Sequence, residues 1–164
     1  MRLVNCTTLE LEEFFGTNIP SYAILSHTWG DSEVSFAEYT CNQAAVSTKE
    51  GYNKIVLTCR QARLDELNYA WVDTCCIDKS SSAELSEAIN SMFAWYRSST
   101  VCYAYLSDVF KSDLGNGLVY SRWFTRGWTL QELLAPTKML FYDHNWVMLG
   151  SRWHLAKKTL DRVQ

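Results

Sequence analysis

The stretch that decides the fold is AWVDTCCIDKSSSAELSEAINSMFAWYRSSTVCYAYLS, residues 70–107. It predicts a strand, a loop, a helix and a second strand. Residues 70–73 form a short run of buried-strand type, and residues 100–106 are rich in the β-branched and aromatic side chains of a central strand. Between them, Ser81 and Glu84 have the spacing of a capping box at a helix start. A strand–helix–strand unit of this length connects parallel strands.

The predicted helix carries one apolar stripe. Its apolar residues recur at spacings of three and four: Leu85, Ala88, Ile89, Met92, Trp95 and Tyr96. This period places them on one face of a helix, with Glu84 and Glu87 outside the stripe.

The neighbouring segments extend this unit on both sides. Tyr22–Ser26 is a short apolar strand, and residues 52–67 have a helical pattern that leads into the strand at 70–73. A fourth strand is expected at 139–142. Residues 146–149 are either a fifth strand or the lead-in to a final helix over 151–163.

Three further segments are less regular. Residues 1–20 are expected to be an N-terminal edge strand or hairpin that ends in the turn at 16–20. Residues 107–117 read as a loop because of Gly115-Asn116-Gly117. Thr129 and Glu132 have capping-box spacing, and Pro136 would end that helix.

The chain length of 164 residues favours a single domain over residues 1–164, and the predicted elements make it an α/β domain. Strands alternate with helices throughout, and this order predicts a mostly parallel sheet. The formal charge is −3, and without a Lys/Arg cluster this argues against nucleic acid as the main partner. No apolar run reaches the roughly 20 residues of a membrane span.

The six cysteines and three histidines show no metal-ligand spacing, so no metal site is predicted, although Asp73 or Asp78 could still hold a divalent ion. No signal peptide is recognised at the N-terminus. Because the sequence shows neither a signal peptide nor a membrane span, we expect the protein to be cytoplasmic, with its thiols reduced.

Five strings in this chain resemble the fungal heterokaryon incompatibility (HET) domain. They are YAILSHTWG at 22–30, GYNKI at 51–55, WVDTCCIDKSSSAELSEAINSMFAWY at 71–96, VCYAYLSDV at 101–109 and RGWTLQELLAP at 126–136. The resemblance implies an effector of non-self recognition and programmed cell death. One departure is Asp65-Glu66, where the family pattern has Asp-Gly. Family members usually continue past the position of Gln164, so the chain could be a C-terminally shortened domain.

A second, patchier resemblance is to the Toll/interleukin-1 receptor (TIR) domain. Residues 22–31 are similar to its first strand and the turn that follows. Residues 84–108 are similar to its third-strand region, and residues 120–133 to the plant TIR pattern that contains the catalytic glutamate. The resemblance implies a flavodoxin-like, open, mostly parallel sheet with helices on both faces. It places the catalytic glutamate of the NAD⁺-cleaving members at Glu132.

The chemistry that this implies is hydrolysis of NAD⁺, or of a related nucleotide, at its N-glycosidic bond. Nicotinamide leaves as a neutral group, so one carboxylate is enough to bind ribose and stabilise the oxocarbenium-like charge. NAD⁺ is then the substrate, and no cofactor is required. The ligand is expected at the carboxyl ends of the first and third strands. The residues expected to contact it are Ser26, His27, Trp29, Gly30, Asp31, Asp73, Asp78, Ser107, Asp108, Arg126 and Trp128.

Each of these assignments has a structural alternative. Glu132 and Glu84 can be helix caps, Trp29 and Trp128 can be core residues, and the adjacent Cys75 and Cys76 can be simple packing. At the level of function, the rivals are a non-enzymatic module that recruits partners by homotypic contacts, and a TIR-type nuclease or cyclic nucleotide synthetase. The expected partners are further copies of the domain and the regulatory domains or sensor proteins that detect non-self.

Overall fold

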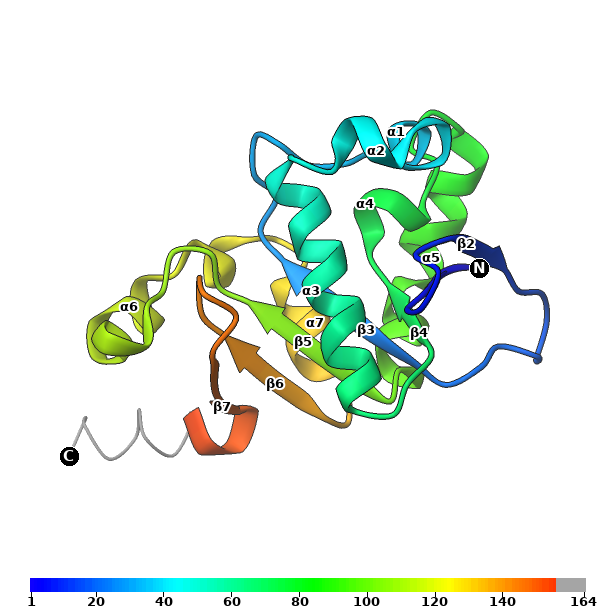
Figure 1. Ribbon diagram of the computed structural model, residues 1–164. Helices are drawn as coiled ribbons and strands as arrows, with labels where there is room; N and C mark the ends of the chain where they lie inside the picture. Colours follow the sequence, from blue (N-terminus) through cyan, green and yellow to red (C-terminus); the bar gives the residue numbers. More distant parts are fainter. Residues whose placement is uncertain (156–164) are drawn as a thin grey trace.

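The computed structural model describes residues 1–155, apart from the side chains of residues 113–116. Within these residues the chain forms one seven-stranded mixed sheet with helices on both faces (Figure 1). The elements in chain order are β1 (Arg2–Asn5), β2 (Leu11–Glu13), β3 (Tyr22–His27), α1 (Phe36–Cys41), α2 (Gln43–Val46), α3 (Glu50–Leu64), β4 (Tyr69–Trp71), α4 (Asp73–Cys76), α5 (Ser82–Ser98), β5 (Val101–Tyr105), η1 (Lys111–Asp113), α6 (Leu114–Tyr120), η2 (Arg122–Thr125), α7 (Thr129–Leu134), β6 (Met139–Tyr142) and β7 (Met148–Ser151).

The sheet has a parallel centre and antiparallel edges. Its strand order is β2-β1-β4-β3-β5-β6-β7. β3 pairs in parallel with β4 on one side and with β5 on the other, and β5 pairs in parallel with β6. β1 and β2 form an antiparallel hairpin at one edge, and β7 lies antiparallel to β6 at the other. The predicted α/β architecture is confirmed, and the sheet that the described residues form is mixed, with three parallel and three antiparallel strand pairs.

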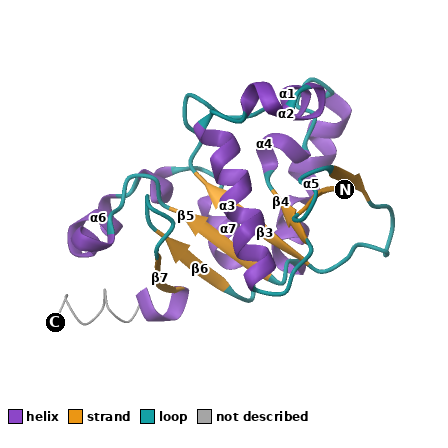
Figure 2. Ribbon diagram, in the orientation of Figure 1, coloured by secondary structure: helices purple, strands orange, loops and turns teal. Residues whose placement is uncertain are grey.

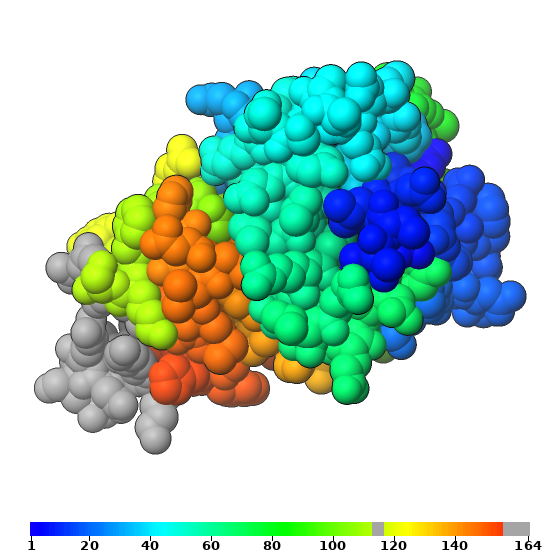
Figure 3. Space-filling model, in the orientation of Figure 1, coloured from blue at the N-terminus to red at the C-terminus, as the bar shows by residue number. Residues whose placement is uncertain are grey.

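The longer helices lie on opposite faces of this sheet. α3 crosses one face, and α5 and α7 lie behind the strands on the other (Figures 1 and 2). On the α5 face, the Tyr96 hydroxyl donates a hydrogen bond of 3.1 Å to the Leu25 carbonyl. At the far end of α3, the Tyr103 hydroxyl of β5 donates to the Asp65 carboxylate at 2.7 Å. The segment with α1 and α2 forms one end of the molecule, beside the N-terminal hairpin (Figure 3).

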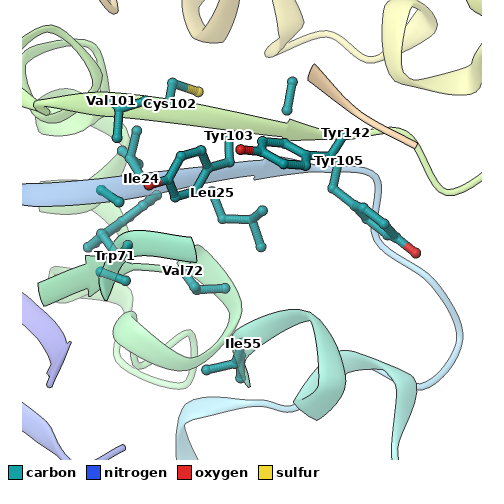
Figure 4. Packing of buried hydrophobic residues seen from close by; sticks show 14 of the residues in the cluster. Ile24, Leu25, Ile55, Trp71, Val72, Val101, Cys102, Tyr103, Tyr105 and Tyr142 are labelled. Atoms are coloured by element: carbon teal, nitrogen blue, oxygen red, sulfur yellow. The ribbon is translucent and has the colours of Figure 1, made fainter. Parts of the chain in front are cut away.

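The core lies on both faces of the parallel strands, and on one of them Trp71 packs against Trp95 and Tyr96 of α5. Ile55 of α3 faces Leu25 of β3 and Val72, which follows β4 (Figure 4). These residues are buried, as are Trp71 and Tyr103. These aromatic or branched side chains come from segments that the apolar patterns predicted, so the core is that of the predicted sheet.

Two predicted segments differ in the structure. The strand expected at 70–73 stops at Trp71, and Asp73–Cys76 turns into the short helix α4. The expected loop at 107–117 is wrong, because it contains η1 and the start of α6. Glycine and asparagine have low helix propensity, which is why the sequence predicted a loop at 115–117.

The C-terminal prediction had two alternatives, and a fifth strand is the one found. β7 begins at Met148, two residues later than expected. Of the final helix predicted over 151–163, residues 156–164 lie outside the described part of the chain. Among the described residues, no helix has the length and apolar character needed to cross a membrane.

Candidate functional site

Two side-chain clusters meet where β3 ends. Ser26 and His27 are the last two residues of this central strand, and both are buried. Consecutive side chains of a strand point to opposite faces, so each of them begins a cluster on its own side of the sheet. This end of β3 lies beside β5. The order of the parallel strands reverses here, because β4 lies on one side of β3 and β5 lies on the other.

The first cluster is built around the carboxylate of Glu132. Its Oε2 accepts a hydrogen bond from Ser26 Oγ at 2.5 Å and another from Arg126 Nη1 at 2.8 Å. Its Oε1 accepts from Arg126 Nη2 at 3.0 Å. The Trp123 indole donates to Ser26 Oγ at 2.8 Å from a fully buried position. Glu132 is 2% exposed, and the paired guanidinium makes a buried carboxylate tolerable there.

The local structure of α7 explains how Glu132 reaches the sheet. The predicted capping box at Thr129 is wrong: the N-cap residue is Trp128, and it makes no side-chain capping bond. The Thr129 hydroxyl instead donates to the Trp123 carbonyl at 2.5 Å. The Glu132 carboxylate therefore extends away from its own helix toward β3, because Ser26 and Arg126 supply the donors there.

The second cluster is built around Asp73, at the start of α4. Its Oδ1 lies 3.0 Å from His27 Nε2, and its Oδ2 accepts from the Trp29 indole at 2.9 Å. The Lys79 ammonium lies 3.6 Å from Asp73 Oδ2 and 3.7 Å from the centre of the Trp29 ring. The exposed Trp29 is thus fixed by a hydrogen bond and a cation–π contact.

Asp73 is ionised over the whole physiological range. Burial raises the pKa of its carboxyl, but the hydrogen bond with His27 and the electrostatic interactions with His27, Lys79 and Arg126 lower it to about 2. Arg126 holds Glu132 and also lowers the pKa of the Asp73 carboxyl, so its charge acts on both clusters.

The loop between β3 and α1 is anchored on α3 behind this site. The buried Lys54 ammonium lies 2.5 Å from Glu33 Oε1, which also accepts the backbone N–H of Gly30 at 2.8 Å. Glu33 Oε1 is 3.8 Å from His27 Nδ1. This distance is too long for a hydrogen bond, so Nδ1 has no hydrogen-bond partner among the described residues, and the imidazole is held through Nε2 and Asp73.

The structure brings together six of the expected ligand or catalytic residues: Ser26, His27, Trp29, Asp73, Arg126 and Glu132. The other expected residues have different surroundings. Asp31 is exposed, Gly30 contributes only its backbone, and Trp128 is partly exposed beside α7.

Three more of the expected residues make local contacts. Asp78 accepts hydrogen bonds from the backbone N–H and hydroxyl of Ser80, so it closes its own turn. The Ser107 carbonyl faces His144 Nδ1 at 2.9 Å. Asp108 accepts from the Ser121 hydroxyl at 2.7 Å and anchors the start of η2.

The expectations for the two helix-cap glutamates also differ in outcome. Ser81 caps α5 by accepting the Glu84 N–H at 3.4 Å. The Glu84 carboxylate binds Arg2 and the backbone N–H of Asp78, so the capping-box reading holds for the serine side only.

Four residues of the site were not singled out from the sequence: Glu33, Lys54, Lys79 and Trp123. Lys54 lies within the quoted string GYNKI, and Trp123 lies within residues 120–133, the range given for the TIR resemblance. Position within such a string was the available signal. That position does not identify the residue that each side chain contacts, because most of these contacts join residues far apart in the sequence.

The donor set around Asp73 does not suit a cation. The ammonium group of Lys79 lies 3.6 Å from Asp73 Oδ2, and its positive charge opposes a divalent ion. Among the described residues, no group of three or more His, Cys, Asp or Glu side chains could hold a metal.

Comparisons with known proteins identify the family of the chain. Residues 22–118 match the family described as Heterokaryon incompatibility protein (HET). The chain is similar to Vegetative incompatibility protein HET-E-1 of Podospora anserina, with 48% identity over 153 residues. This match covers 87% of the present chain and 11% of that relative's length. No solved structure matches the chain. On the family match and this identity, the chain belongs to the heterokaryon incompatibility (HET) family.

Proposed function

We propose that this domain hydrolyses NAD⁺ or a related nucleotide at the N-glycosidic bond, and that Glu132 is the catalytic residue. The observation that carries the proposal is the buried Glu132 carboxylate at the carboxyl end of β3, beside β5. In open α/β sheets, ligands bind outside the carboxyl ends of the strands at the point where the strand order reverses. Loss of NAD⁺ would make the domain a cell-death effector in incompatibility between fungal strains.

The strand order supports the finer fold that this proposal assumes. The four parallel strands lie in the order β4-β3-β5-β6, which is second, first, third and fourth along the chain. This is the beginning of the flavodoxin-like order. We therefore infer that residues 1–164 form a single flavodoxin-like, TIR-like HET domain.

The proposed reaction needs one carboxylate and an ordered nucleotide. The bond between ribose C1′ and the nicotinamide nitrogen breaks, and its electron pair leaves with nicotinamide. The oxygen of water adds to C1′ and releases a proton, which gives the ribosyl product. Glu132 would bind the ribose hydroxyls and stabilise the positive charge that develops on the sugar.

The rest of the site offers contacts for the remainder of the ligand. The Trp29 ring is 53% exposed and the Trp128 ring 41% exposed, and both are flat partners for a base. Arg126 has the planar fork that binds phosphate oxygens in pairs. Self-association would bring further side chains to this open rim.

The experiment is to measure NAD⁺ in cells that express this chain fused to an oligomerising domain. We expect NAD⁺ to fall with the wild-type chain and to stay level with Glu132→Gln. The matched control is Glu10→Gln, at an exposed glutamate remote in sequence from the site. Circular dichroism of purified Glu132→Gln shows whether it is folded, because Arg126 loses its charged partner. Cell death with unchanged NAD⁺ in the wild type would exclude this activity.

A second function is favoured by a different observation. Apolar side chains of α5 and α7 are exposed although these helices contact each other: Ile89, Phe93, Leu130 and Leu134. Such a face fits a module that acts by homotypic contacts. The two proposed functions predict opposite outcomes for Glu132→Gln, since a module that acts only by homotypic contacts does not need that carboxylate.

A further inference from the structure

The Glu132 carboxylate is closed in this structure. Oε2 already has two donors, from Ser26 and Arg126, and Oε1 has a donor from Arg126. The side chain of Glu132 is 3% exposed. Oε1 could accept one more hydrogen bond, but this position is buried with the rest of the side chain, so we expect a ribose hydroxyl to reach it when one of the two donor residues moves aside.

Of the two donor residues, Arg126 is the one that can leave. Ser26 belongs to the central strand, is fully buried, and is also held by the Trp123 indole. Arg126 precedes α7 in the segment after η2, and its side chain is 20% exposed. A long flexible side chain at the rim can rotate out with little change to the backbone, whereas a strand serine cannot.

A diphosphate is the ligand that would draw Arg126 away. The guanidinium fork pairs as well with phosphate oxygens as with a carboxylate. Arg126 already contributes positive charge around Asp73, together with Lys79, whose side chain is 34% exposed. The ion pair that Arg126 would form with a phosphate replaces the one that it loses with Glu132.

We propose that Arg126 is a latch that keeps Glu132 closed until a diphosphate group takes the guanidinium as its partner. This inference rests on the proposed function, because it concerns how the same carboxylate becomes available. A nucleotide's own diphosphate then opens the site, and ligands without one leave Glu132 paired. Arg126 acts as a positioning and gating residue rather than as a group that reacts.

The test reads the accessibility of Glu132 directly and needs no turnover. The chain is treated with a carbodiimide and glycine ethyl ester, and modification of Glu132 is measured by peptide mass spectrometry. The exposed Glu10 is the internal reference. Inorganic pyrophosphate is the probe, and sodium chloride at equal ionic strength is its control.

We expect Glu132 in the wild type to be protected relative to Glu10, and pyrophosphate to raise its modification several-fold. Arg126→Ala should be modified strongly without pyrophosphate and should not respond to it. Arg97→Ala, at an exposed arginine near the end of α5, should behave like the wild type.

Three outcomes would overturn the latch. They are an unprotected Glu132 in the wild type, a wild type that does not respond to pyrophosphate, and a folded Arg126→Ala that stays protected. If Arg126→Ala does not fold, the wild-type response to pyrophosphate decides alone. A latch that responds in a chain that releases no nicotinamide would separate failure of the proposed hydrolysis from failure of this inference.

Discussion

Glu66 adopts the left-handed backbone conformation, with φ of 61°. It follows the end of α3, where its N–H donates to the Arg63 carbonyl at 3.1 Å and the Leu67 N–H donates to the Ala62 carbonyl at 2.8 Å. This is the Schellman arrangement, in which glycine is the preferred residue. The Asp-Gly pattern expected at 65–66 therefore has a physical reason, and this chain departs from it at a cost in backbone strain.

We predict that Glu66→Gly stabilises the domain by about 0.5–1 kcal/mol, since relief of the left-handed strain exceeds the added chain entropy. Urea unfolding at neutral pH measures the change. Glu87→Gly, on the exposed face of α5, is the matched control and should destabilise the domain by about 1 kcal/mol. Equal losses for both variants would show that Glu66 is not strained.

Asp73 makes a pH-dependent contribution to stability. Its pKa is about 2 in the folded chain, below the usual value of about 4 in an unfolded chain. The contribution is therefore fully present above about pH 4, and it is lost as the pH falls toward about 2. Its size at neutral pH is about 2 kcal/mol.

We expect the difference in unfolding free energy between wild type and Asp73→Asn to shrink between about pH 5 and about pH 2. Urea unfolding at a series of pH values in this window measures it. Asp31→Asn, at an exposed aspartate in the neighbouring loop, is the control. A difference that stays constant with pH would mean that His27, Lys79 and Arg126 do not stabilise the ionised form.

At the scale of elements, α3 supports the loop that carries Trp29. Gly51, in the first turn of α3, donates its N–H to the Ser32 carbonyl at 3.0 Å. A Cβ there would lie 2.7 Å from Glu33 Cα and 2.8 Å from the Val34 backbone nitrogen. Backbone atoms on both sides cannot give way, so only glycine allows this close approach.

We predict that Gly51→Ala destabilises the domain by about 1–3 kcal/mol through overpacking and increases hydrogen exchange in residues 28–34. Urea unfolding and hydrogen-exchange mass spectrometry measure the two effects. Gly127→Ala is the control, because nothing lies within 4 Å of its added Cβ. Unchanged exchange in the loop would show that α3 does not hold it in place.

The elements that sequence predicts best are those whose patterns reflect burial. β3, β5, β6, α3 and α5 all follow apolar patterns that the sheet and its faces then explain. Two local predictions were wrong: the loop at 115–117 and the capping box of Thr129 and Glu132. In the second case Ser26, 106 positions away, donates to Glu132 the hydrogen bond that the backbone N–H of the N-cap residue would donate in a capping box.

The candidate site was predictable in its place and only partly in its contacts. A strand end followed by polar residues indicates where ligands bind, and Ser26, His27 and Trp29 follow from that rule. The pairing of Glu132 with Arg126, and of Glu33 with Lys54, depends on which helices pack on which face. No spacing in the sequence encodes those distances.

At the scale of the whole molecule, the exposed face of α5 and α7 is the part that a second copy could cover. Leu130 is 65% exposed and Leu134 is 62% exposed, so changes there should alter unfolding free energy by no more than about 0.5 kcal/mol. We predict that Leu130→Asp with Leu134→Asp weakens self-association of the chain and leaves the fold intact. Sedimentation velocity over a range of concentrations measures this. The control is Val119→Asp, at an exposed apolar residue on α6. An unchanged sedimentation coefficient in the double variant would show that this face is not a homotypic contact.

We propose that the Glu132 carboxylate is needed to cleave the N-glycosidic bond. The most direct measurement is nicotinamide release from NAD⁺ by the purified chain fused to an oligomerising domain, followed by chromatography. We predict release by the wild type, loss of nearly all release in Glu132→Gln, and wild-type release in Glu10→Gln. Release that survives in folded Glu132→Gln would contradict the account, because the bond would then be broken without this carboxylate.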